Sequence, residues 1–123
     1  TAQAYLNEEA VGNAWKKSGV NRDEIFLVSK VWHSNYGEGQ TMKSIDESLR
    51  KLQTDYIDLM LLHQPYCDRY GAYRDLEKAY KAGSNFALGF LIGLSSIEKY
   101  SNCFRLTITP RKGVKVIVVS KGI

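Results

Sequence analysis

Short apolar runs alternate along the chain with longer segments in which apolar residues recur at helical spacing. The runs at 25–31, 56–62 and 90–94 are nearly continuous in apolar character and contain β-branched or aromatic residues. Runs of this length and composition are typical of strands buried on both faces. A further run at 114–119 is strongly β-forming. We therefore expect four strands.

Two amphipathic helices are expected in the first half of the chain. The first should follow Asn7, whose side chain would cap it, and end at Gly19. Its apolar positions are Ala10, Val11, Ala14 and Trp15. The second should follow the glycine-rich loop at 32–39 and carry an apolar stripe opposite charged residues. The stripe consists of Met42, Ile45, Leu49 and Leu52.

A third amphipathic helix is expected at 70–82, where Gly83 would close it. Its apolar positions are Ala72, Tyr73, Leu76, Ala79 and Tyr80. A short helix is expected at 97–100, after the apolar run at 90–94. Strands and helices thus alternate throughout the chain.

This alternation predicts a single α/β domain built around a parallel sheet. The regular spacing fits a (β/α)8 barrel as well as a doubly wound sheet. In either arrangement the carboxyl ends of the strands share one edge. Lys30, His63 and Ser95 each stand near the exit of a predicted strand. We therefore expect the functional site at this edge.

Composition narrows the classes of partner. Hydrophobic residues make up 44% and charged residues 24% of the chain, which disfavours disordered, collagen-like and coiled-coil proteins. The formal net charge is +4, but basic and acidic residues are interleaved, so no nucleic-acid partner is expected. No apolar run approaches the roughly 18 residues of a membrane span. The two cysteines and two histidines lack the spacing of metal ligands, so no metal site is expected. The cysteines are expected to be reduced thiols of a cytoplasmic protein.

Three side chains could carry proton chemistry, although each has a simpler structural explanation. Lys30 could extend from its strand to the surface, His63 could be a satisfied structural residue, and Tyr5 could be a packing aromatic. Together they form a proton-donor set, because a phenol becomes a usable acid when a neighbouring cation stabilises its phenolate.

Three motifs occur in order along the chain: TAQAYLNE at 1–8, VSKVW at 28–32 and DYIDLMLLHQP at 55–65. Together they resemble consecutive motifs of the aldo-keto reductases, a family of (β/α)8-barrel enzymes that use NADPH, or less often NADH, to reduce aldehydes and ketones. The resemblance covers 1–83, whereas 84–123 diverges. It implies that 1–123 is one partial barrel domain with about half of a barrel, and we expect it to be part of a longer protein.

The resemblance also implies roles for individual residues. Tyr5 matches the general acid that protonates the carbonyl oxygen, Lys30 the cation that stabilises its phenolate, and His63 the imidazole that orients the carbonyl. The aspartate that pairs with the lysine in this family would precede Thr1.

Four further residues are matched to binding roles by the same resemblance. Trp32 and Tyr36 match the loop that shapes the substrate pocket, although Trp32 could also be a simple packing residue. Ser95 matches a contact to the nicotinamide amide, and Lys121 a phosphate-binding lysine. The implied cofactor is NADPH and the implied substrate a small aldehyde or ketone.

Two other kinds of protein stay open as alternatives. The first is a non-catalytic interaction module or truncated inactive relative, which the missing aspartate and the divergent segment 84–123 would explain. A half barrel would expose sheet edges and so could associate with a second copy. The second is a doubly wound binding domain, which is disfavoured because Gly37-Glu38-Gly39 is followed neither by the third glycine of a dinucleotide fingerprint nor by the lysine of a phosphate loop.

Overall fold

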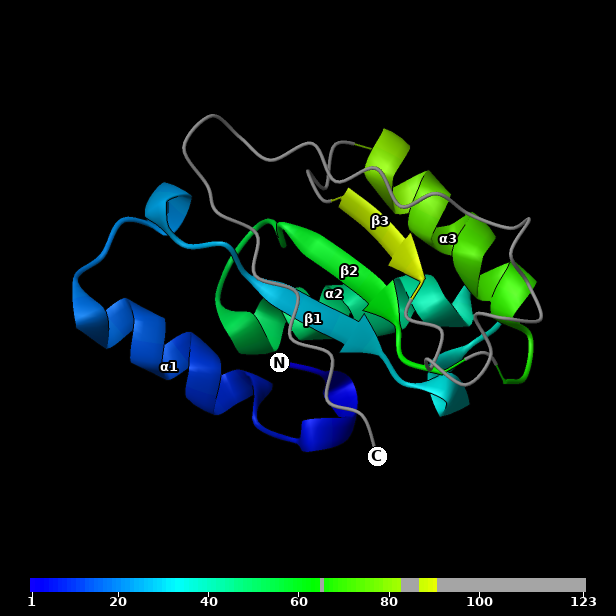
Figure 1. Cartoon of the computed structure of the whole chain (residues 1–123), viewed down its shortest axis with the longest axis horizontal. Coiled ribbons are helices and arrows are strands. Elements are labelled where there is room, and N and C mark those ends of the chain that lie inside the picture. Colours follow the sequence, from blue (N-terminus) through cyan, green and yellow to red (C-terminus); the bar gives the residue numbers. More distant parts are fainter. Residues whose placement is uncertain (65, 83–86, 91–123) are drawn as a thin grey trace, which may run out of the picture.

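A computed structural model of the chain describes residues 1–64, 66–82 and 87–90. In these residues helices and strands alternate, as the hydrophobic pattern predicts (Figure 1). The α-helices are α1 (Glu8–Ser18), α2 (Gln40–Leu52) and α3 (Arg69–Lys81). The strands are β1 (Val28–Val31), β2 (Leu59–Leu62) and β3 (Ala87–Phe90). Three short 3-10 turns are η1 (Gln3–Tyr5), η2 (Arg22–Glu24) and η3 (His33–Asn35).

The strands form a parallel sheet in the order β1-β2-β3. Lys30 of β1 lies opposite Leu61 of β2, and Leu62 lies opposite Phe90 of β3. Each pair of neighbouring strands is joined by a helix, so the expectation of an α/β fold with a parallel sheet is confirmed. The carboxyl ends of β1 and β2 therefore point to the same edge of the sheet.

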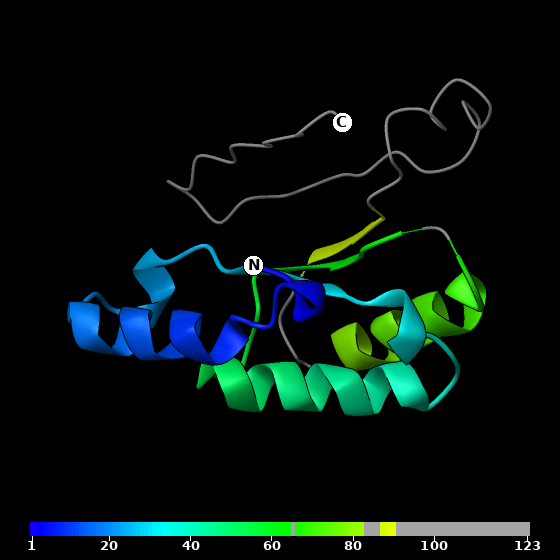
Figure 2. The same cartoon turned by 90° about the horizontal axis from the view of Figure 1, so that it is seen from below.

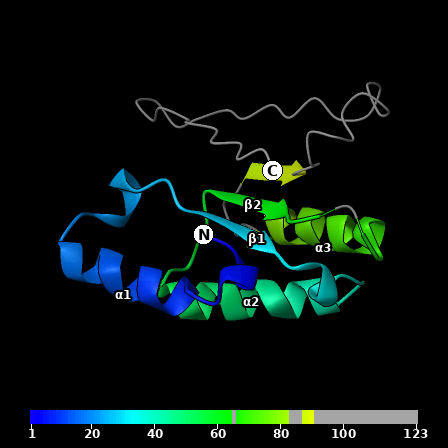
Figure 3. The ribbon, with the colours of Figure 1, turned by 60° about the horizontal axis from the view of Figure 1, so that its bottom comes forward.

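All three α-helices lie on one side of the sheet (Figure 2). Helix α2 lies between α1 and α3 and contacts both of them (Figure 3). The core fills the space between these helices and the sheet. Its fully buried large apolar side chains are Val31, Ile45, Leu52, Ile57, Met60, Leu62 and Leu76. The stripe predicted for α2 is confirmed, since Ile45 and Leu52 are buried and Met42 and Leu49 pack against the core.

The strands differ from their predicted extents. Strand β1 covers only the last four residues of the run at 25–31, and its burial alternates, whereas all four residues of β2 are buried. The run at 90–94 shares only Phe90 with β3. Residues 91–94 and the predicted elements at 97–100 and 114–119 lie outside the described residues.

The prediction for α1 is confirmed for Val11, which packs against the core, and for Trp15, which is partly buried and donates to the Leu52 carbonyl, but not for its two alanines. Ala10 and Ala14 are exposed, whereas Gly12 is buried against the last turn of α2. A side chain at this glycine would collide with the backbone of α2, so the close approach of the two helices decides which face is inside. The predicted cap is also wrong: the Asn7 side chain does not cap α1 and instead accepts a hydrogen bond from the Thr1 hydroxyl.

Helix α3 is nearly as predicted, with Ala72, Leu76 and Ala79 buried. Tyr80 is the exception, because it lies on the solvent side and is 54% exposed. The buried carboxylate of Asp75 reaches across to α2 and accepts a hydrogen bond from the backbone N–H of Gly39 at 2.6 Å. The amino end of α2 is thus capped by a neighbouring helix. In the described part of the chain, no helix has the length and apolar character to cross a bilayer.

Candidate active site

The two strand-end residues predicted to meet do so at the carboxyl edge of the sheet. Lys30 is the third residue of β1, and His63 follows β2 directly. The backbone N–H of His63 donates to the carbonyl of Val31 at 3.0 Å, which extends the parallel ladder by one residue and ties the two strand ends together. Both side chains are partly buried.

Tyr5 is brought to the same edge by the turn η1, which packs against β1. Its hydroxyl lies 3.5 Å from the Lys30 ammonium nitrogen, and that nitrogen lies 4.9 Å from the centre of the Tyr5 ring. Lys30 also donates to the Thr1 carbonyl at 3.0 Å, which fixes the direction of its long side chain. A cation is therefore held beside a phenol that is 54% exposed and accessible to a ligand.

The His63 ring completes the cluster. It meets the Tyr5 ring edge-on, with ring centroids 5.7 Å apart. Burial lowers the pKa of His63, and the nearby Lys30 and His33 lower it further, so the imidazole is neutral at pH 7. Its Nδ1 atom is buried and has no hydrogen-bond partner among the described residues. A neutral imidazole beside a phenol and an ammonium can donate a hydrogen bond to a carbonyl oxygen.

Of the two residues matched to the substrate pocket, Trp32 packs against His63, whereas Tyr36 is buried in the core. The Trp32 ring contacts His63 with centroids 5.0 Å apart and contacts His33 with centroids 4.1 Å apart. Tyr36 belongs to the hydrophobic core, is 6% exposed and donates its hydroxyl hydrogen to the Gln64 carbonyl at 2.8 Å. Tyr36 thus packs in the core and ties its hydroxyl to the backbone next to His63, and its role in binding a substrate stays a prediction.

Two polar residues near the site were not singled out from the sequence. Glu8 is 3% exposed, and its carboxylate accepts hydrogen bonds from Ser29 at 2.6 Å and from Ser48 at 3.3 Å. Gln3 hydrogen-bonds to the loop that carries Trp32. A charged residue at the start of a helix is usually explained by the helix dipole, and the partners of Glu8 are remote in the sequence, so no local pattern identifies it.

The chemistry of the described residues suits a carbonyl group that accepts hydride from a nicotinamide cofactor. They offer an accessible phenol next to a cation and a neutral imidazole, which is a donor set for a carbonyl oxygen. Ser95 and Lys121, predicted to hold the cofactor, lie outside the described residues. Within 1–64, 66–82 and 87–90, no group of three residues is arranged to bind a metal ion.

Comparison with known proteins connects this geometry to a family. The family model for the aldo/keto reductase family matches residues 1–119. Glyoxal reductase of Bacillus subtilis is 48% identical over 90 residues, which cover 72% of this chain and 33% of that protein. Methylglyoxal reductase DkgB of Yersinia pestis is 49% identical over 65 residues, covering 53% of this chain and 24% of that protein.

Solved structures agree on the fold. The crystal structure of an aldo-keto reductase from Bombyx mori in complex with NADP superposes with a TM-score of 0.72 at 27% identity, covering 87% of this chain and 40% of that one. The chain spans a third or less of the length of the two curated relatives, so its fold is part of a (β/α) barrel, as predicted. The chain belongs to the aldo/keto reductase family.

Proposed function

We propose that this chain carries the catalytic edge of an oxidoreductase that reduces small aldehydes or ketones with NADPH. The observation that carries the proposal is the 3.5 Å approach of the Lys30 ammonium to the Tyr5 hydroxyl, with the His63 ring against the same tyrosine. Reduction of a carbonyl needs a hydride at carbon and a proton at oxygen. The three side chains account for the proton.

Each side chain has a distinct part in this proposal. Tyr5 donates its proton to the carbonyl oxygen as the alcohol forms, and Lys30 stabilises the phenolate that remains. Neutral His63 hydrogen-bonds to the same oxygen and fixes its position against Tyr5. Trp32, which packs on His63, provides an apolar wall for the rest of the substrate.

The nicotinamide, when bound, supplies the hydride. We assign Ser95 to its amide and Lys121 to its phosphates, as the family resemblance implies. The assignment of NADPH is supported by relatives of known structure, three of which are described as complexes with NADP or NADPH. For the substrate we propose small dicarbonyl aldehydes, since relatives are described as glyoxal and methylglyoxal reductases.

Replacing Tyr5 with phenylalanine tests the proposal. The full chain should oxidise NADPH in the presence of methylglyoxal, and Tyr5→Phe should lower turnover about 10² to 10⁴-fold, the usual contribution of a general acid. Tyr80→Phe is the matched control, because Tyr80 is also 54% exposed but lies on α3 away from the site. We expect it to retain full activity.

Two results would contradict the proposal. The first is Tyr5→Phe retaining turnover close to that of the Tyr80→Phe control. The second is a chain that neither turns over nor binds the cofactor, measured by quenching of tryptophan fluorescence on titration with NADPH. That result would favour a non-catalytic interaction module of the same family.

A further inference from the structure

The side chain of Gln3 joins the turn that carries Tyr5 to the loop that carries Trp32. Gln3 and Tyr5 are the first and last residues of η1. The Gln3 carboxamide oxygen accepts one hydrogen bond from the backbone N–H of Trp32 at 2.9 Å and a second from the side chain of Asn35 at 2.8 Å. Trp32 precedes η3 and Asn35 ends it, so both ends of this loop are held by one oxygen atom.

The nitrogen of the same carboxamide is bound to helix α2. It donates to the carbonyl of Ser44 at 3.1 Å and to the hydroxyl of Ser48 at 3.0 Å. Gln3 thereby uses both of its acceptor sites and both of its donor hydrogens. A reversed amide would direct its NH2 group at the N–H of Trp32, so these partners fix the orientation of the carboxamide.

The position of the Trp32 loop in turn affects His63. The Trp32 ring meets the His63 ring at an angle of 72° with centroids 5.0 Å apart. The other titratable or charged groups that face His63 among the described residues are Lys30 from β1, His33 from η3 and Tyr5 from η1. Burial is the largest cause that lowers the pKa of His63, and Trp32 is the aromatic neighbour closest to this ring.

We propose that Gln3 is a positioning residue of this site: through its four hydrogen bonds it holds the Trp32 loop against His63 and so sets the position of the Trp32 ring at the site. Gln3 does not touch the reacting groups in this account and acts through Trp32. The effect on His63 follows from the geometry alone, whereas the effect on catalysis rests on the proposed function.

Gln3→Met is the first test, because methionine has a similar length and makes none of the four hydrogen bonds. The titration of the His63 imidazole is followed by NMR in the full chain. The pKa of His63 should rise toward the ordinary histidine value of about 6.5, because a released Trp32 loop lets water reach the ring. In turnover assays, kcat/KM should fall about 10 to 100-fold, the effect of a site misplaced by about 1 Å.

Gln40→Met is the matched control. Gln40 also hydrogen-bonds to the loop, but through a single contact from its exposed side chain to the Ser34 carbonyl at 2.8 Å. We expect its His63 titration to match the wild type. Asn35→Ala is the second variant and removes one of the two loop contacts to Gln3 while leaving Gln3 in place. It should raise the pKa of His63, as Gln3→Met does, but by a smaller amount.

The inference is overturned if folded Gln3→Met titrates like the wild type, or if Gln40→Met shifts His63 as much as Gln3→Met does. Should Gln3→Met fail to fold, Asn35→Ala decides, and an unchanged His63 titration in that variant overturns the inference. The two proposals fail separately: a chain without reductase activity refutes the proposed function, while the His63 titration still tests the role of Gln3.

Discussion

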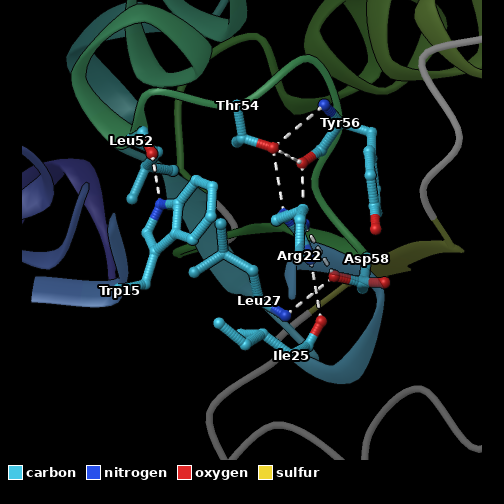
Figure 4. Close-up of polar contacts among 8 residues, drawn as sticks. All are labelled: Trp15, Arg22, Ile25, Leu27, Leu52, Thr54, Tyr56 and Asp58. Carbon is cyan, nitrogen blue, oxygen red and sulfur yellow. Dashed lines mark hydrogen bonds and ion pairs between the residues drawn. The ribbon is translucent and has the colours of Figure 1, made fainter. Parts of the chain in front are cut away.

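Arg22 should stabilise the chain more than any exposed ion pair, because it connects the segments that lead into the amino ends of β1 and β2. Its guanidinium bonds Asp58 at 2.8 Å, the Tyr56 carbonyl at 2.8 Å and the Ile25 carbonyl at 2.8 Å (Figure 4). It also donates to the Thr54 hydroxyl at 2.9 Å and lies 3.9 Å from the centre of the Tyr56 ring. The side chains of Arg22 and Asp58 are only 12% and 13% exposed.

Arg22→Met removes this charge and leaves its partners buried. Asp58 keeps one hydrogen bond, from the backbone N–H of Leu27 at 2.8 Å, but loses its cation. Breaking a buried pair in this way costs about 3–5 kcal/mol of unfolding free energy. With a urea m value of about 2 kcal/mol/M, the unfolding midpoint should fall by about 2 M. Urea unfolding followed by far-UV circular dichroism measures this shift.

Arg50→Met is the control that separates the effect of burial on stability from the effect of a short ion-pair distance. Arg50 makes an equally short contact with Glu47, at 2.7 Å, but the two side chains are 69% and 46% exposed. This pair is solvated and screened, so its loss should leave the midpoint unchanged within error. Equal shifts in the two variants, or no shift in Arg22→Met, would show that burial does not give the Arg22 network its strength.

Three other outcomes follow from the same structure. Gly12→Ala should lower the free energy of unfolding by about 1–3 kcal/mol in urea unfolding, because the new Cβ would lie 2.5 Å from the Lys51 carbonyl oxygen. Alanine favours helices, but this collision outweighs that preference. The control Lys17→Ala, at an exposed position of the same helix, should leave the free energy of unfolding unchanged. Stability should fall as the pH drops through about 6.5, the ordinary histidine value, because the pKa of His63 is lowered on folding and the unfolded chain therefore binds the proton first. His63→Asn should lose less stability over this pH drop in the same urea assay, and an unchanged slope would contradict the assignment. Asp75→Ala should lower thermal stability by about 1 kcal/mol or more through loss of the α2 cap, which scanning calorimetry measures.

The proximity of Lys30 and His63 at the strand ends could be predicted from the sequence, because it follows from the alternation of strands and helices. Parallel strands joined by helices place their carboxyl ends at one edge, so Lys30 and His63 had to be neighbours. Tyr5 lies on no strand, so the alternation does not place it beside the other two; the chemistry of a phenol beside a cation and the family resemblance suggested the grouping. The structure then brings its hydroxyl to Lys30.

What escaped prediction depends on contacts between residues far apart in the sequence. The inner face of α1 is set by the close approach of Gly12 to α2, a fact that apolar spacing does not contain. The roles of Gln3 and Glu8 arise from partners on β1, α2 and the Trp32 loop. Polar residues with distant partners look like surface residues in a sequence, and only the fold shows that they are buried or shared.

We propose that Tyr5, Lys30 and His63 form the site at which a carbonyl is reduced. The most direct test is to supply the full chain with NADPH carrying deuterium at the transferable position of its nicotinamide ring, together with methylglyoxal, and to analyse the product by mass spectrometry. The alcohol should carry the deuterium on the former carbonyl carbon, and Tyr5→Phe should yield far less of it. An unlabelled alcohol, or equal labelled product from Tyr5→Phe and the wild type, would contradict it.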